Sequence, residues 1–252
     1  MPRAWSTHWC CSQRKTTMNK PGTLYGIGVG PGDPELITLK AKRALARMKI
    51  IFAPVAGKGK ESIAWSIART YVAVDARVEH LYFPMTHDRA DRERAWEDSA
   101  RSVARVLETG TDAAFITLGD PMTYSTYGYL LKTMKGLYPL MPMITIPGIP
   151  AYLAGAAAAS LPLAQGHEIL AIVPGSASAE RIRECLASSD TIVFLKHNNA
   201  SRTIHELLRE MDLQERAIYV RRLGFPDEQV TADQARGLSG SEDYLSLIIV
   251  KK

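Results

Sequence analysis

Two Gly-Asp-Pro triplets, Gly32-Asp33-Pro34 and Gly119-Asp120-Pro121, are the residues whose types and positions best suit ligand binding. Each follows an apolar run that is rich in β-formers, residues 23–29 and 113–118. Open α/β sheets bind ligands beyond the carboxyl ends of their strands, where both triplets are expected to lie. Gly, Asp and Pro are also common turn residues, so a purely conformational role stays open.

The loop of the first triplet is poorly built for anionic phosphates. Residues 28–33 fail the GxGxxG pattern because the last position is Asp, and the chain contains no GxxxxGK[ST] pattern. Pro31 and Pro34 lack the backbone N–H that a phosphate would need, and Asp33 adds negative charge. The loop therefore favours a neutral or cationic ligand over a dinucleotide.

Strand and helix signals alternate from residue 22 onward, which indicates α/β units around a largely parallel sheet. Asp33 is a good N-cap and Pro34 a good first residue for a helix whose apolar positions continue to Met48. We predict strands at residues 23–29, 49–54, 76–83, 113–118, 143–146, 169–173, 191–195, 217–220 and 244–250. Further helices are predicted at residues 61–71, 88–107, 151–160, 179–187 and 200–212.

The Pro- and Gly-rich stretch 142–150 is the best boundary between two domains. We predict an N-terminal α/β domain over residues 21–146, with a largely parallel sheet, and a C-terminal mixed α/β domain over residues 147–252. Residues 1–20 show neither a strand nor a helix period, so we expect a disordered N-terminal extension there.

Composition excludes several classes of protein. The formal net charge is +5, but residues 1–20 hold four of the 31 basic residues and no acidic one, which leaves 27 basic against 26 acidic residues. Residues 21–252 are therefore nearly neutral, which argues against nucleic acid as a partner. No apolar run approaches the roughly 18 residues of a membrane span, and the N-terminus lacks a secretory signal. We expect a soluble, cytoplasmic protein.

Metal-ligand spacing is not apparent either. The three cysteines include an adjacent pair that is not a CxxC motif, and the His205-Glu206 dipeptide does not continue into HExxH. We therefore predict no protein-bound metal.

Four segments together resemble the signature motifs of the tetrapyrrole methylase family. They are residues 25–41 (YGIGVGPGDPELITLKA), 118–126 (LGDPMTYST), 147–152 (PGIPAY) and 191–196 (TIVFLK). Their order and spacing extend the resemblance over residues 22–252. It implies a two-domain homodimer that binds S-adenosylmethionine between its domains and methylates a tetrapyrrole, releasing S-adenosylhomocysteine.

Carried over position by position, the resemblance also implies which residues contact the cofactor. A cationic sulfonium suits backbone carbonyls and an acidic residue, which makes Asp120 the strongest single candidate. The alternative for Asp120, that it caps the turn after a buried strand, stays open. The implied cofactor contacts are Pro31, Leu118, Gly119, Asp120, Thr123, Tyr124, Ser125, Pro150, Ala151, Leu195 and Lys196.

Within the family, residues 51–57, 83–86 and 124–126 resemble the members that methylate C20 of precorrin-2 or its cobalt-containing counterpart in cobalamin biosynthesis. The segments typical of uroporphyrinogen-III methyltransferases are absent, which disfavours that regiochemistry. Other tetrapyrrole regiochemistry and ribosomal RNA 2′-O-methylation by the same fold stay as alternatives, as does a non-catalytic nucleotide-binding module. The nearly neutral charge of residues 21–252 argues against RNA, and the shortage of backbone N–H donors in the first loop argues against nucleotides.

The catalytic base stays unidentified. Tyr124 and Tyr219 are candidates by position only, and a packed core tyrosine is the alternative for each. Arg221 and Arg222 follow the predicted strand 217–220 and could pair with the carboxylates of a tetrapyrrole.

Overall fold

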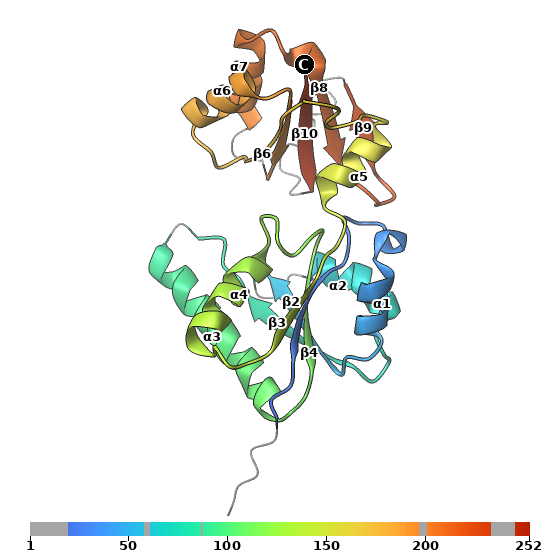
Figure 1. Cartoon of the computed structure of the whole chain (residues 1–252), viewed down its shortest axis with the longest axis vertical. Coiled ribbons are helices and arrows are strands. Elements are labelled where there is room, and N and C mark those ends of the chain that lie inside the picture. The colour runs from blue at the N-terminus through green and yellow to red at the C-terminus, as the bar shows by residue number, and fades with distance from the viewer. Residues whose placement is uncertain (1–19, 58–60, 87, 197–200, 233–244) are drawn as a thin grey trace, which may run out of the picture.

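A computed structural model describes residues 20–57, 61–86, 88–196, 201–232 and 245–252. These described residues form two five-stranded sheets, which stand one above the other in Figure 1. Residues 147–150 connect the last strand of the first sheet to the first helix of the second part. The predicted domain limits stay predictions, and the predicted N-terminal extension lies outside the described residues except for Lys20.

The first sheet is entirely parallel, with the strand order β3-β2-β4-β1-β5. Every residue of its central strand β4 is buried, as the continuous apolar run predicts. The predicted parallel sheet is therefore confirmed. Its strands are β1 (Leu24–Gly28), β2 (Ile50–Val55), β3 (Arg77–Tyr82), β4 (Ala113–Thr117) and β5 (Met143–Ile146).

Helices cover both faces of this sheet. One apolar layer contains α1 (Leu39–Leu45) and α2 (Ile63–Ala68), and the other contains α3 (Arg89–Glu108) and α4 (Thr126–Leu137), as Figure 1 shows. The neighbouring strands β1 and β4 are thus followed by helices on opposite faces. Such a reversal is the topological switch point at which α/β sheets bind ligands.

The predicted helix from Pro34 to Met48 is two elements, so the prediction of one continuous helix is wrong. Asp33 does cap the start, where its Oδ1 accepts the N–H of Glu35 at 2.8 Å, but the result is a short 3₁₀ helix η1 (Pro34–Leu36). Thr38 then caps α1, its Oγ1 accepting the N–H of Ala41 at 3.2 Å. The hydroxyl of Thr38 supplies a second N-cap, which competes with continuing the first helix.

Helix α4 and the short strand β9 (Gln229–Thr231) are absent from the sequence predictions. Helix α4 begins after Ser125, whose Oγ accepts the N–H of Tyr127, and it buries Tyr127, Leu130 and Met134 on one face. That spacing is helical, but two glycines in the segment lower its helix propensity and weaken the pattern.

The second sheet is mixed, with the order β6-β7-β10-β8-β9, as predicted for the C-terminal part. Only β6 and β7 run parallel to each other; the other described neighbours are antiparallel. Helix α5 (Ala151–Ala158) covers one face and α6 (Ala179–Ser188) and α7 (Ser201–Glu210) the other. The remaining strands are β6 (Leu170–Pro174), β7 (Thr191–Leu195), β8 (Ala217–Arg221) and β10 (Ser246–Lys251), and short 3₁₀ turns η2 (Arg69–Tyr71) and η3 (Gln214–Arg216) join the elements.

Among the described residues, no helix has the length and apolar character needed to cross a membrane.

The ring of Tyr127 fixes the packing of α4 on the first sheet. The side chain is fully buried, and its hydroxyl lies 3.1 Å from Oγ1 of Thr145. The ring passes directly over Gly26 of β1, where an added Cβ would lie 2.0 Å from Cζ of Tyr127. Glycine at position 26 is therefore required by the close approach of the ring.

We predict that Gly26→Ala lowers the free energy of unfolding by about 1–3 kcal/mol, because the buried ring has little room to move. Gly128→Ala in α4 is the matched control, since an added Cβ there meets nothing within 4 Å. Replacing that helical glycine should raise stability by about 0.5–1 kcal/mol. Urea unfolding of the two variants measures both changes, and a Gly26→Ala protein as stable as the original would contradict this packing.

Candidate functional site

The strands of the first sheet bring the motif segments to one edge. Because all its strands are parallel, the segments that follow them lie at the same end of the sheet. The three motifs after β4, β1 and β5 are neighbours there. Residues 83–86 follow β3 beside the end of β2, where Phe83 N donates to Val55 O at 2.9 Å.

The first and second motifs are joined directly through their backbones. Gly119 N donates to Gly30 O at 2.7 Å, and Gly30 N donates to Gly119 O at 3.3 Å. Both glycines have positive φ, 82° at Gly30 and 68° at Gly119, a conformation that other residues adopt with strain. This two-bond bridge spans the switch point between β1 and β4.

The third motif packs against the same point. An added Cβ at Gly28 would lie 2.6 Å from Gly119 O and 2.7 Å from Gly148 N, and one at Gly148 would lie 2.3 Å from Gly119 O. A side chain at either position would collide with backbone. The three segments therefore touch because glycine occupies these places.

Asp120 ties the second motif to the third. It is half-buried, its Oδ1 accepts the N–H of Met122 at 2.8 Å, and its Oδ2 accepts the N–H of Gly148 at 3.1 Å. The turn-capping role considered for Asp120 is thus confirmed. Each carboxylate oxygen keeps a further lone pair, so the same group can also face a cation.

Other predicted contacts line the same junction. An added Cβ at Gly119 would lie 3.7 Å from Cα of Pro150 and 3.9 Å from N of Ala151. Ser125 Oγ lies 2.8 Å from Thr117 Oγ1, which anchors the end of the second motif. Of the remaining positions, Pro31 is buried, and Leu118, Thr123 and Leu195 are half-buried.

The fourth motif, in the second sheet, contacts the second motif, which follows β4 of the first sheet. Lys196 Nζ donates to the backbone oxygen of Tyr124 at 2.7 Å. The hydroxyl of Tyr124 donates to the backbone oxygen of Ile172 in β6 at 3.1 Å. The structure therefore connects all four motif segments.

Neither tyrosine suits the role of proton acceptor. Tyr219 is 2% exposed, lies in the apolar layer under α6 and α7, and stacks on His205; burial raises its pKa to about 12. Strand alternation in β8 turns Tyr219 away from the face that α5 covers, so the structure shows it as the packed core tyrosine considered as its alternative role. Partial burial is the main cause that raises the pKa of Tyr124, and the electrostatic effect of Cys185 raises it further. The hydroxyl of Tyr124 acts as a hydrogen-bond donor.

Arg221 and Arg222 lie at the end of β8, beside a turn that packs on the first motif. An added Cβ at Gly32 would lie 2.0 Å from the backbone oxygen of Leu223 in this turn. Arg222 Nε lies 2.5 Å from Oδ2 of Asp227, so a substrate carboxylate at Arg222 would compete with that ion pair.

Sequence reasoning missed three residues that shape the junction: Ile172, Leu223 and Gly224. Gly224 has a φ of 77°, and an added Cβ there would lie 2.1 Å from N of Asp33. Its RLGFP context signals a turn. No local pattern signals the partner of that turn, which lies far away in the sequence.

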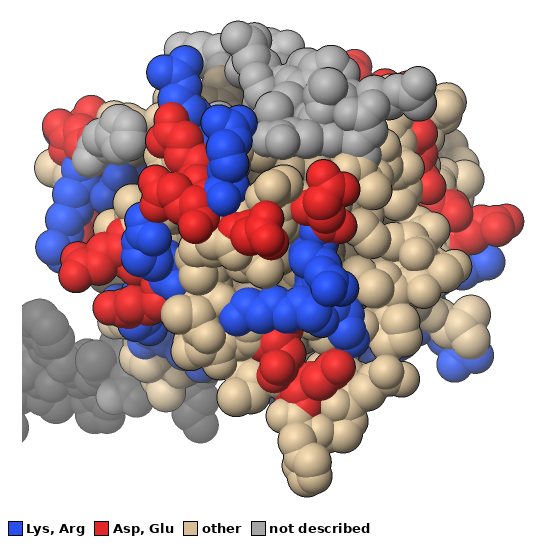
Figure 2. Space-filling view, turned by 90° about the horizontal axis from the view of Figure 1, so that it is seen from above, with Lys and Arg blue, Asp and Glu red and all other residues tan. Residues whose placement is uncertain are grey.

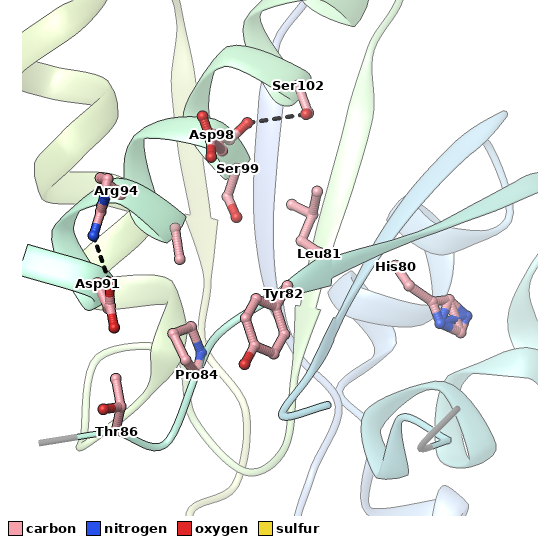
Figure 3. Close-up of a pocket in the computed structure, with 11 residues that line it drawn as sticks. His80, Leu81, Tyr82, Pro84, Thr86, Asp91, Arg94, Asp98, Ser99 and Ser102 are labelled. Atoms are coloured by element: carbon pink, nitrogen blue, oxygen red, sulfur yellow. Dashed lines mark hydrogen bonds and ion pairs between the residues drawn. The ribbon is translucent and has the colours of Figure 1, made fainter. Parts of the chain in front are cut away.

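A separate hollow of about 520 Å³ lies between β3 and α3, as Figure 3 shows. Pro84 and Thr86 line it, together with the Asp91–Arg94 ion pair, whose atoms lie 2.6 Å apart. The implied cofactor residues do not line this hollow. It is therefore distinct from the junction of the motifs.

Comparison with known proteins agrees with this geometry. The family model described as tetrapyrrole (corrin/porphyrin) methylases matches residues 23–238. The chain belongs to the tetrapyrrole methylase family. A probable cobalt-precorrin-2 C(20)-methyltransferase of Methanocaldococcus jannaschii is 36% identical to this methylase over 91% of the chain and 96% of the relative. The cobalt-precorrin-2 C(20)-methyltransferase of Salmonella typhimurium is 35% identical over 82% and 86%.

The fold of this methylase is also seen in a solved structure. The uroporphyrin-III C-methyltransferase of Thermus thermophilus, complexed with S-adenosylhomocysteine, superposes with a TM-score of 0.60. The two chains are 23% identical, and the match covers 92% of this chain and 98% of the other. The likeness confirms the predicted two-sheet α/β fold.

The junction fits S-adenosylmethionine in its donor chemistry. The first loop has prolines where N–H groups would be needed for phosphate, while carbonyl oxygens and the carboxylate of Asp120 suit a cationic sulfonium. Within the described part of the chain, no group of three or more His, Cys, Asp or Glu side chains could hold a metal ion.

We predict that Asp120→Ala weakens S-adenosylmethionine binding about tenfold or more, because two hydrogen bonds to a charged group are lost at the junction. Asp112→Ala is the matched control: Asp112 Oδ1 accepts the N–H of Thr23 at 2.7 Å just before β4, at the opposite edge of the sheet. Calorimetric titration of both folded variants decides the matter. Equal affinities in the two variants would remove Asp120 from the site.

Proposed function

We propose that this methylase transfers the methyl group of S-adenosylmethionine to C20 of precorrin-2 or of its cobalt-containing counterpart, in cobalamin biosynthesis. One observation carries the proposal: the first three motif segments meet at the carboxyl ends of the parallel strands of the first sheet. Residues 51–57 and 83–86, which resemble the C20-methylating members, belong to the neighbouring strands and the segments that follow them. The names of the two relatives support the same regiochemistry.

The proposed cofactor contacts are those at and beside the glycine junction. We place the sulfonium near Asp120 and the carbonyl oxygens of the second motif, where a negative environment stabilises the cation. S-adenosylmethionine supplies an electrophilic methyl group when it is bound. The proposed contacts are Pro31, Leu118, Gly119, Asp120, Thr123, Tyr124, Ser125, Pro150, Ala151, Leu195 and Lys196.

The work of the protein is then positioning. A meso carbon flanked by pyrrole nitrogens is already nucleophilic, so rate depends on alignment with the methyl group and on exclusion of water. The backbone bridge between Gly30 and Gly119 suits this demand because two hydrogen bonds hold the loops together without ordering any side chain. The C20 proton needs an acceptor, and neither Tyr124, a donor, nor buried Tyr219 is suited to accept it.

The substrate carboxylates need cationic partners. We propose Arg221 and Arg222 for this role, since their turn lies against the first motif. If a substrate carboxylate displaced the carboxylate of Asp227, Arg222 would keep an ion-pair partner both before and after substrate binding. We further propose that two domains meet near residue 147, and that the protein is a cytoplasmic homodimer, as the family resemblance implies.

The RNA alternative gains no support from the face in Figure 2. Basic and acidic side chains are interleaved there, whereas an RNA site gathers basic side chains on one surface.

We predict that one methyl group is added, at C20, with one S-adenosylhomocysteine released per product. A misplacement of about 1 Å can cost roughly 10²-fold in rate, so a single position should dominate. Carbon-13 NMR of product made with a labelled methyl donor locates the new carbon, and uroporphyrinogen III serves as the control substrate. Label at C2, C7 or C17, or methylation of uroporphyrinogen III, would refute the assignment.

A further inference from the structure

Tyr124 connects the second motif segment to the second sheet through two different groups. Its backbone oxygen accepts from Nζ of Lys196 at 2.7 Å, and its hydroxyl donates to the backbone oxygen of Ile172 at 3.1 Å. Ile172 belongs to β6, and Lys196 directly follows β7, the parallel neighbour of β6. One residue of the first part of the chain is thus bound to two adjoining strands of the second sheet.

Both partners have an unusual backbone conformation. The φ angle is 49° at Tyr124 and 54° at Lys196, in the left-handed region that residues with a side chain seldom occupy. Such residues persist only where the surroundings fix them, and they concentrate at functional sites. The bond between them is charge-assisted, since a lysine ammonium donates to a carbonyl oxygen. The contact thus joins two residues in uncommon backbone conformations through a charge-assisted hydrogen bond.

We propose that Tyr124 and Lys196 form a latch between the two sheets that holds the second motif segment in the geometry for methyl transfer. The latch consists of the two hydrogen bonds given above. The inference rests on the proposed function, because it gives that reaction two positioning residues. It assigns Lys196 a role through Tyr124, and this role replaces the direct cofactor contact proposed for Lys196 above from the family resemblance.

The latch completes the support of the second motif. Gly119 is held by Gly30, and Asp120 by Gly148, both on the side of the first sheet. Ser125 is held by Thr117 at the start of α4. Tyr124 lies between these anchors, and its partners come from the second sheet. Loss of the latch would let this turn shift, and methyl transfer is sensitive to shifts of about 1 Å.

The test compares three variants without any ligand. Lys196→Met removes the ammonium, Tyr124→Phe removes only the hydroxyl, and Lys135→Met is the control. Lys135 is exposed near the end of α4, about 15 Å along the helix from its start. We expect amide hydrogen exchange in residues 122–128 and 170–175 to be about tenfold faster in Lys196→Met. Tyr124→Phe should show a smaller change in the same segments, and Lys135→Met none.

Steady-state kinetics give the second readout. In Lys196→Met we expect kcat to fall about 10- to 100-fold while both KM values stay within about threefold, because alignment is lost and binding is kept. Lys196→Arg keeps a cationic donor and should recover most of kcat. Unchanged melting temperatures will show that the variants are folded.

The proposal is overturned if exchange in Lys196→Met equals that of the original protein, whatever happens to activity. Unchanged exchange with a KM for S-adenosylmethionine raised about tenfold would show instead that Lys196 binds the cofactor directly. Failure of the original protein to methylate any tetrapyrrole would refute the proposed function. The exchange comparison uses no ligand, so it still decides whether the latch exists.

Discussion

The contact of three glycine backbones, at positions 28, 119 and 148, is the constraint on which the rest of the site depends. Added side chains at Gly28 and Gly148 would come within 2.3–2.9 Å of neighbouring backbone atoms, so no other residue allows the approach. Parallel strands deliver the three segments to one edge, and the reversal between β1 and β4 opens that edge to a ligand. Prolines in place of N–H donors in the first loop, and the carboxylate of Asp120 at the junction, suit a cationic methyl donor.

The polar side chains at the junction mainly make hydrogen bonds to the backbone and do not form an acid–base pair. Asp120 binds two backbone N–H groups, Ser125 caps α4, and Lys196 binds a backbone oxygen. This distribution agrees with a reaction in which the electrophile comes with the cofactor and the nucleophile with the substrate. A protein for such chemistry needs accurate positions more than it needs a strong acid or base, which agrees with the poor suitability of both Tyr124 and Tyr219.

Local patterns predicted much of the fold. The apolar runs at 143–146 and 191–195 match β5 and β7 residue for residue, and Asp33 caps a helical turn as its position suggests. The break at Thr38 was missed because a hydroxyl cap within a periodic apolar stretch leaves that period intact. Contacts between distant segments were not predictable: Tyr124 and Lys196 are 72 residues apart, and a lysine that binds a carbonyl oxygen leaves no pattern in the sequence. The sequence left the role of Tyr219 open, because the pattern of a strand does not say which of its faces an active site shares; the structure shows Tyr219 packed in the apolar layer under α6 and α7.

A crystal structure of the protein with S-adenosylhomocysteine tests the central claim most directly. The glycine junction predicts that the ligand lies beyond the carboxyl ends of β1 and β4, in contact with Gly119, Asp120 and Ala151. S-adenosylhomocysteine bound in the hollow between β3 and α3, or anywhere that leaves these three residues uncontacted, would contradict it.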